Sequence, residues 1–502
     1  MKPAKLVLCV IDAMAPAMLE RAVAAGVAPV LGELMRRGTY VPDCAAAFPS
    51  VTPVCAASIA TGTSQERHRV PGMNWYLRQE DRYVEYGSSF RASQRFGIVR
   101  QLTDTVYNLN RAHLAPEVPT VFESLDDAGL RTAGTTYLIY RGRHRHEPQR
   151  EGALGRLASS TLARHPVMGP RELFYADIFA SRRTGCRSTL GMPGVRDQHS
   201  GCVSAYMVEH DLFDFLLLSL PDNDWHSHKR GPEGQLRSLA LADAQLARTM
   251  EPAGGVGEFL ADHAVVVMAD HSQAEVRDTI DLAPALAELD VLAPGARGEQ
   301  AARARLALCP SQRAAMVYLL GEHRRGALRS DVVRRALSLD GVELVLWLER
   351  DAHGTALEAA VARPGVGELR FRPDGDDARD ARGGTWAIDG ELAVLRAEVR
   401  DGALHTPEHP DALARAWAAL TCPSSGEVLL SAGPGYEFLD WGGQAHVGGG
   451  SHGSLRGEDS LGALILCGLS HQGPAPPEDR SAQWSIADVA PLVLDHFGVT
   501  AA

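Results

Sequence analysis

The sequence predicts an α/β protein with a mostly parallel central sheet that is covered by helices on both faces. Short apolar runs bounded by turn residues recur along the chain, and segments with helical periodicity lie between them. Alternation of this kind is typical of parallel sheets. No apolar run reaches the ~18 residues that a membrane span needs. We therefore expect the functional residues at the carboxyl ends of the strands, where ligands of such sheets gather.

The expected strands are the most apolar short segments. They are Lys5–Asp12, Thr132–Tyr140, Phe213–Leu220, His263–Ala269 and Gly462–Gly468. Helices are expected at Val30–Arg37 and at Pro232–Met250. The second of these carries an apolar face formed by Leu236, Leu239, Leu241 and Leu246.

Residues 291–404 differ from the rest in being rich in Ala, Arg and Gly. They include an expected helix, Ser330–Leu339, and two expected strands, Val342–Leu348 and Thr385–Leu395. The stretch RPDGDDARDARGG is expected to be a loop. We interpret the region as a smaller α+β cap inserted into a catalytic core that is formed by residues 1–290 and 405–502.

Composition excludes several classes of function. The 502 residues are 45% hydrophobic and 22% charged, which is ordinary for a globular protein, and the net charge is −12. We do not expect a net acidic chain to be a general binder of nucleic acids or anionic membranes, because both require clustered cations. The 8 cysteines form no CxxC pair and indicate neither a disulfide framework nor a zinc ribbon. Asp12 interrupts the N-terminal apolar stretch, so we expect a first strand instead of a signal peptide, and a cytoplasmic protein.

Two candidate residues lie near the N-terminus. Asp12 ends the first expected strand, where it is either a ligand or a turn residue. Thr52 follows a proline-flanked turn and precedes an Ala-rich helix that ends at Thr61. The unpaired N–H groups of a helix N-terminus favour anions, and a hydroxyl there can be a nucleophile. The alternative for Thr52 is a helix N-cap.

The densest polar cluster follows the expected strand at Phe213–Leu220. It contains two overlapping Asp-x-x-x-His pairs, Asp222 with His226 and Asp224 with His228. Carboxylate and imidazole ligands a few residues apart at a strand end suit zinc or manganese. The alternative is a solvated polar loop.

Two further histidines are candidates. Asp270-His271 directly follows an expected strand, at the carboxyl end where functional residues gather. The other Asp-His pair, Asp262-His263, lies at the start of that strand. His452 lies in a Gly-rich loop, where glycines let the backbone approach a ligand. His446, six residues earlier, is the alternative candidate for the same role. The basic run 141–146 either steers an anionic substrate or is a solvated face.

The ordered set of motifs resembles the alkaline phosphatase superfamily, and within it the nucleotide pyrophosphatase/phosphodiesterase branch. FPSVTPVCAASIATGTSQERH resembles the nucleophile helix of that branch, and VMADHS and GGGSHGS resemble its metal motifs. The resemblance implies an alkaline-phosphatase-like three-layer sandwich. It leaves out the cap and the segment Tyr76–Val118.

The resemblance also implies a site with two zinc ions, or manganese. The implied ligands of one ion are Asp12, Thr52, Asp270 and His271, and those of the other are Asp224, His228 and His452. The pair Asp224/His228 is chosen because the family pattern is His-x-x-Gly-Pro, and Gly231-Pro232 has that spacing from His228. Asp222 and His226 then support the ligands or face the substrate.

The implied reaction is hydrolysis of a small phosphodiester or nucleotide pyrophosphate through a phospho-threonine at Thr52. Asn74 is the implied ligand of a phosphoryl oxygen, although the family spacing from His68 falls on Met73. The alternatives within enzymes are a phosphonate hydrolase, acting on a phosphonoacetate-like substrate, and a phosphomonoesterase. The alternative outside enzymes is a metal-binding module, which would need no nucleophile.

Overall fold

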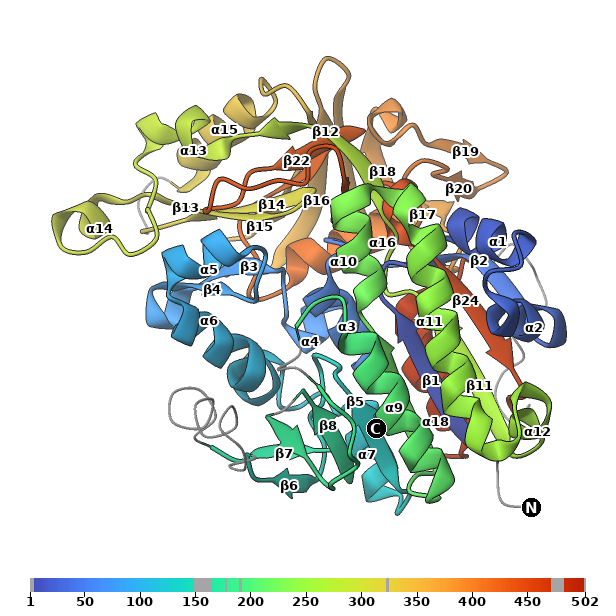
Figure 1. The fold of residues 1–502 in the computed structure, drawn as a ribbon. Coiled ribbons are helices and arrows are strands. Elements are labelled where there is room, and N and C mark those ends of the chain that lie inside the picture. Colours follow the sequence, from blue (N-terminus) through green and yellow to red (C-terminus); the bar gives the residue numbers. More distant parts are fainter. Residues whose placement is uncertain are drawn as a thin grey trace.

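The computed structural model describes residues 4–148, 165–176, 178–188, 192–321, 325–470 and 483–500. Its centre is an eight-stranded sheet with the order β2-β24-β11-β1-β10-β5-β8-β9 (Figure 1). These strands are β2 (Thr39–Ala45), β24 (Leu461–Cys467), β11 (His263–Met268), β1 (Lys5–Ile11), β10 (Phe215–Leu220), β5 (Thr132–Thr135), β8 (Glu172–Tyr175) and β9 (Phe179–Ala180).

Strand β1 lies at the middle of this sheet. It pairs in parallel with β10, Leu6 opposite Phe215, and with β11, Lys5 opposite His263. β5 and β8 continue the parallel arrangement, whereas β24 is antiparallel to β11. The prediction of a mostly parallel sheet is therefore confirmed.

Helices cover both faces of the sheet, so its strands are apolar on both sides. One face packs against α1 (Pro16–Ala24), α2 (Pro29–Arg37), α9 (Arg196–Glu209) and α11 (Gln235–Met250). The opposite face packs against α3 (Thr52–Thr61), α7 (Val121–Asp127) and α18 (Val489–His496). This arrangement is the three-layer sandwich that the sequence predicts (Figure 1).

Two details of the core differ from the sequence predictions. The expected strand Thr132–Tyr140 ends at Thr135, because Thr136 takes a left-handed backbone and the rest of the apolar run leaves the sheet. Tyr140 is buried, but its N–H binds the Asn110 side chain instead of a neighbouring strand. Leu241, expected on the apolar face of α11, is 46% exposed.

A second sheet of nine strands lies beyond the first, at the top of Figure 1. Its order is β13-β14-β21-β15-β16-β17-β20-β19, and β18 pairs with β17. The strands are β13 (Leu306–Ser311), β14 (Ala314–Leu319), β21 (Val428–Ala432), β15 (Val342–Arg350), β16 (Ala356–Arg363), β17 (Gly367–Arg379), β20 (Ala403–His405), β19 (Glu398–Arg400) and β18 (Thr385–Gly390). Helix α15 (Arg325–Ala336) packs against this sheet.

The prediction that RPDGDDARDARGG forms a loop is wrong over most of this stretch. β17 continues to Arg379 and pairs with β18 on both sides of an irregularity between Pro373 and Ala378. The carboxylate of Asp377 accepts a hydrogen bond from the Ile388 backbone, so its charge is accommodated in the strand. The expected strand Thr385–Leu395 ends at Gly390 and is followed by a short 3-10 turn, Leu392–Leu395. One strand of this sheet, β21, comes from outside residues 291–404. The boundaries of the cap therefore stay a prediction.

Six of the 8 cysteines are buried free thiols. Cys186 and Cys202 form a disulfide between α9 and the segment before it, which the scattered cysteine pattern does not predict. Among the described residues, no helix combines the length and the apolar character that crossing a membrane requires.

Candidate metal centre

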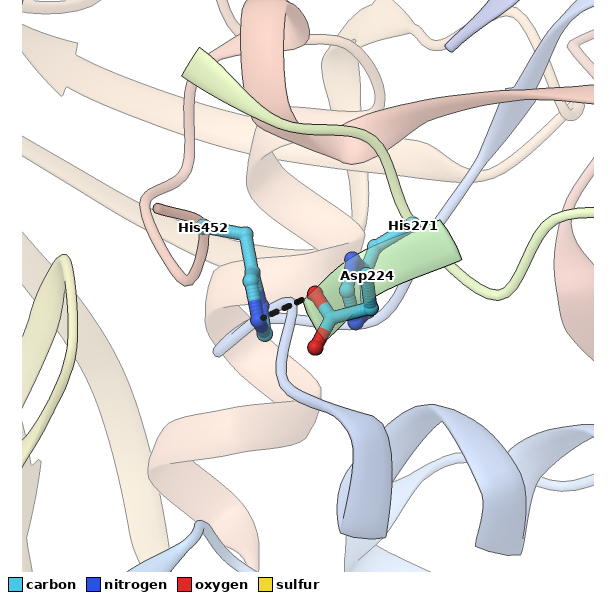
Figure 2. A group of neighbouring side chains, drawn as sticks. All are labelled: Asp224, His271 and His452. Carbon is cyan, nitrogen blue, oxygen red and sulfur yellow. Dashed lines mark ion pairs between the residues drawn. The ribbon is translucent and has the colours of Figure 1, made fainter. Parts of the chain in front are cut away.

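The candidate residues meet at the carboxyl edge of the central sheet. Because β1, β10 and β11 are adjacent and parallel, the segments that follow them lie side by side. These segments carry Asp12, helix α10 (Asp222–Arg230) and Asp270-His271. In Figure 2, Asp224, His271 and His452 converge from three separate segments, and Asp224 faces His452.

The first group consists of Asp12, Asp270 and His271, all buried, whose ligand atoms lie within 4.8 Å of one another. His271 Nε2 is 3.6 Å from Asp12 Oδ1 and 3.4 Å from Asp270 Oδ2. The hydroxyl Oγ1 of Thr52 is 3.3 Å from the same nitrogen. Thr52 therefore faces the first group directly.

The second group contains Asp224, His228 and His452. Asp224 Oδ1 is 3.3 Å from His228 Nε2 and 3.5 Å from His452 Nε2. The His452 ring stacks on that of His271, with ring centroids 3.7 Å apart. His271 also lies within 4.8 Å of Asp224 and His452, so the two groups adjoin.

The three histidines are oriented in the same way. His228 Nδ1 lies 2.7 Å from the Gly450 carbonyl, His271 Nδ1 3.0 Å from that of Ser272, and His452 Nδ1 2.7 Å from that of Ser50. A carbonyl accepts only from a protonated Nδ1, so each Nε2 presents its lone pair to the cluster. This is the tautomer and the support that metal-ligating histidines have.

The electrostatics of the cluster favour a bound cation. Burial raises the pKa of Asp12, and the neighbouring Asp270 and Asp224 raise it further. Burial, together with His271, lowers the pKa of His452. Asp12 Oδ1 and His452 Nε2 are buried without a hydrogen-bond partner. Because buried polar atoms are normally satisfied, the donor set fits metal ions that would complete it.

The local structure favours a functional role for Thr52. Val51 is the N-cap residue of α3, and Thr52 is the first helical residue, so the N-cap alternative is wrong. Pro53 follows at a position where a helix tolerates it. The hydroxyl of Thr52 is consequently available to the cluster instead of to the helix backbone.

The contacts of the two overlapping Asp-x-x-x-His pairs of α10 distinguish one pair from the other. The Asp222 carboxylate accepts hydrogen bonds from Gly194 N at 2.8 Å, Arg196 Nε at 2.9 Å and Asp197 N at 3.1 Å. It thereby anchors the start of α9. The His226 ring packs edge-on against Trp225, with ring centroids 4.9 Å apart. Asp224 and His228 are the members that face the cluster.

His446, the competitor of His452, supports the second group from outside. Its Nδ1 lies 2.8 Å from Glu437, and its ring stacks on His228 with centroids 4.0 Å apart. The basic run contributes nothing to the cluster. Arg141 pairs with Glu123 at 3.0 Å and Arg143 with the same residue at 2.8 Å, which favours a structural face over substrate steering.

Asn74 begins a hairpin formed by β3 (Asn74–Leu77) and β4 (Arg82–Glu85). Its side-chain amide donates to the Val84 carbonyl at 2.9 Å, and its backbone N–H donates to Ser311 Oγ at 3.2 Å. Its Oδ1 is buried without a partner. The amide is thus engaged within the hairpin, and contact of Asn74 with a phosphoryl oxygen stays a proposal.

Two glutamines that no motif indicates also border the cluster. Gln273 Nε2 donates to Asp224 Oδ1 at 2.6 Å. Gln312 Nε2 lies 3.4 Å from His228 Nε2. Gln273 could have been suspected from its place two residues after His271. Gln312 carries no signal in the sequence, because it comes from the turn between β13 and β14.

The fold and the clustered ligands define an alkaline-phosphatase-like hydrolase core. The family model described as type I phosphodiesterase / nucleotide pyrophosphatase matches residues 6–455. The chain therefore belongs to this family of the alkaline phosphatase superfamily, and it is a phosphoric ester hydrolase. No curated protein is similar enough to match.

Solved structures share the fold at low sequence identity. One is human ectonucleotide pyrophosphatase/phosphodiesterase 5, 12% identical, with a TM-score of 0.55. Another is phosphonoacetate hydrolase from Sinorhizobium meliloti in complex with phosphonoformate, 17% identical, with a TM-score of 0.52. Each comparison covers 99% of this chain and 96% of the other.

Proposed function

We propose that this protein hydrolyses phosphodiesters or nucleotide pyrophosphates with Thr52 as the nucleophile of a two-zinc site. The observation that carries the proposal is the position of Thr52 Oγ1, 3.3 Å from Nε2 of His271, a residue of the first group that also lies within 4.8 Å of Asp224 and His452. A metal-binding module would need the ligands but no hydroxyl at this point. The non-enzyme alternative is therefore disfavoured.

The seven side chains divide between two ions. Thr52 and the first group (Asp12, Asp270, His271) would hold one ion, and Asp224, His228 and His452 would hold the other. Three carboxylates and three imidazoles suit zinc, with manganese second, better than magnesium, which prefers oxygen. When bound, the ions supply Lewis-acid activation of the hydroxyl and neutralise charge on the leaving oxygen.

The chain itself positions the reacting groups. Thr52 is held at the first residue of α3, where the helix dipole and unpaired N–H groups favour a phosphoryl anion. The hydroxyl of Thr52 loses its proton and Oγ1 forms a bond to phosphorus, while the bond to the leaving oxygen breaks and the leaving group departs as an anion that takes up a proton. Water then hydrolyses the phospho-threonine and regenerates the hydroxyl.

The charge of the site supports a diester as the substrate. No Lys or Arg forms a hydrogen bond or ion pair with Thr52 or the six ligands in the part of the chain that is described. A diester carries one negative charge on phosphorus, whereas a monoester or phosphonoacetate carries two or three. Ligands that pair with no cationic side chain suit the substrate of lowest charge.

The proposal is tested by substrate comparison on protein with measured metal content. Bis-p-nitrophenyl phosphate should show a higher kcat/KM than p-nitrophenyl phosphate, and phosphonoacetate should be the poorest substrate. Preference for phosphonoacetate would instead favour the phosphonate hydrolase. Bound metal without turnover of any of the three would contradict the proposed substrates.

We also propose a cytoplasmic location, which is supported by the six buried cysteines that stay free thiols. The Cys186–Cys202 disulfide argues in the opposite direction, because such bonds persist in oxidising compartments. Thiol titration of protein denatured directly from its native cells decides between them. All 8 cysteines should react if the location is cytoplasmic, whereas six reactive thiols would contradict it.

A further inference from the structure

The turn that joins β13 to β14 has an unusual composition. Ser311 pairs with Ala314, so Gln312 and Arg313 form a two-residue hairpin turn. Gln312 has a φ of +61°, in the left-handed region that glycine and asparagine occupy most easily. A residue with a long side chain in this conformation is uncommon, and such positions concentrate at functional sites.

The turn is fixed to the candidate metal centre. The backbone N–H of Arg313 donates to the carbonyl of His452 at 2.9 Å, and that of Phe438 donates to the carbonyl of Gln312 at 2.9 Å. The buried guanidinium of Arg313 binds the Gly433 carbonyl at 3.0 Å. These bonds hold the strained turn in place beside the second ligand group.

The side chain of Gln312 points to the nitrogen that would bind the metal. Its Nε2 lies 3.4 Å from His228 Nε2, and the residue is only 8% exposed. In the neutral ring that binds metal, His228 Nδ1 carries the proton donated to Gly450, and His228 Nε2 is the acceptor of this contact. A metal ion on His228 Nε2 would occupy that lone pair and leave the amide of Gln312 without its acceptor.

We propose that Gln312 is a substrate-binding residue, whose side-chain N–H donates to an oxygen of the phosphodiester at the second ligand group. The inference rests on the proposed function. The amide is nearly buried, its Oε1 also lacks a partner, and a buried donor requires an acceptor. The oxygen that arrives at this group with the substrate supplies one. An uncharged donor also matches a substrate with one negative charge on phosphorus.

Gln273 gives a matched comparison at the same cluster. Its Nε2 donates to Asp224 Oδ1 at 2.6 Å, so its amide already has a carboxylate acceptor. Its Oε1 lacks a partner, as that of Gln312 does, but its donor is taken, so we expect Gln273 to be a positioning residue for the ligand Asp224. Replacement of Gln312 should therefore weaken phosphate binding, whereas replacement of Gln273 should weaken zinc binding.

The experiment measures three quantities for wild type, Gln312→Met, Gln312→Glu and Gln273→Met. They are zinc affinity of the metal-free protein, affinity of the zinc-loaded protein for inorganic phosphate by calorimetry, and kinetics with bis-p-nitrophenyl phosphate. Gln312→Met should weaken phosphate binding and lower kcat/KM by about 10- to 100-fold, the loss of one hydrogen bond to a charged group. Its zinc affinity should not fall, because a metal ion on His228 Nε2 already displaces the contact with Gln312. Gln273→Met should lower zinc affinity instead.

Gln312→Glu separates a donor from a metal ligand, and it keeps the test valid if the methionine variant does not fold. A donor role predicts weaker phosphate binding than in either wild type or Gln312→Met, because the carboxylate repels the anion. Tighter zinc binding with undiminished phosphate affinity would show that Oε1 acts on the metal, and would overturn the proposal. Phosphate affinity of Gln312→Met equal to that of wild type would overturn it as well.

The calorimetric measurements also separate this inference from the proposed function. Failure of the wild-type protein to hydrolyse the diester would contradict the proposed function. Zinc and phosphate binding would still show whether Gln312 contacts a phosphoryl oxygen.

Discussion

Replacement of Thr52 by alanine should remove catalysis without removing the fold or the metal site. Thr52 is half-buried at the first position of α3, and alanine is well tolerated in a helix. The substitution deletes one contact, the 3.3 Å approach of Oγ1 to His271 Nε2, which contributes about 1 kcal/mol to stability. We therefore expect a folded protein whose zinc content stays close to that of wild type.

The catalytic loss should be far larger than the structural one. Near-attack positioning of a nucleophile contributes ~7 kcal/mol or more, and water has no equivalent fixed position. We expect kcat to fall by ~10³-fold or more, which corresponds to at least about 4 kcal/mol of activation free energy. Thr52→Ser should keep partial activity, because the hydroxyl remains but loses the β-methyl group that fixes its rotamer.

The assay is steady-state hydrolysis of bis-p-nitrophenyl phosphate, with circular dichroism and metal analysis on the same preparations. Thr52→Ser is the matched control, since it retains the hydroxyl at the same helix position. Activity of Thr52→Ala within tenfold of wild type would mean that water is the nucleophile, and the covalent step would be refuted.

Three further outcomes are expected. His228→Ala should lower bound zinc while His226→Ala should not, because only His228 faces Asp224; elemental analysis with the reverse order would shift the ligand assignment by two residues. In oxidised protein, removing the Cys186–Cys202 cross-link should reduce stability by about 3 kcal/mol through its 16-residue separation, and an unchanged denaturation midpoint would contradict this. Burial raises the pKa of Glu85 to about 7, so the folded state favours its protonated form and stability should fall as pH rises from about 4.5 to 7. The free energy of unfolding of Glu85→Gln should vary less with pH over this range, and the variant should be more stable than wild type at pH 8; denaturant unfolding at several pH values measures both.

The fold was predictable because its signals are local. Buried strands such as Lys5–Ile11 and His263–Met268 need apolar side chains on both faces, which produces short apolar runs that the sequence displays. Predictions failed where a buried side chain lies outside a strand, or where an exposed charged side chain lies within one. Tyr140 is aromatic and buried outside the sheet, whereas Asp377 is charged and lies within a strand. Side-chain polarity alone does not determine which backbone groups pair.

The ligand types and their order along the chain are properties of the sequence, and they sufficed to indicate two metal ions and a threonine nucleophile. The choice between the pairs of α10 depended on spacing in the sequence, and tertiary contacts gave it a physical reason. Asp222 is occupied by Gly194, Arg196 and Asp197, which lie about 25 residues earlier.

The sequence by itself determined the layered fold, the family and the side chains that we propose as metal ligands. Only the tertiary structure decided how they are supported: the carbonyls that orient the three histidines, and the approach of Gln312 to His228. These contacts join residues such as Ser50 and His452, 402 positions apart. Short-range patterns register the chemistry of a residue and its neighbours. Contacts over such separations arise from the packing of sheets and turns, which no local pattern encodes.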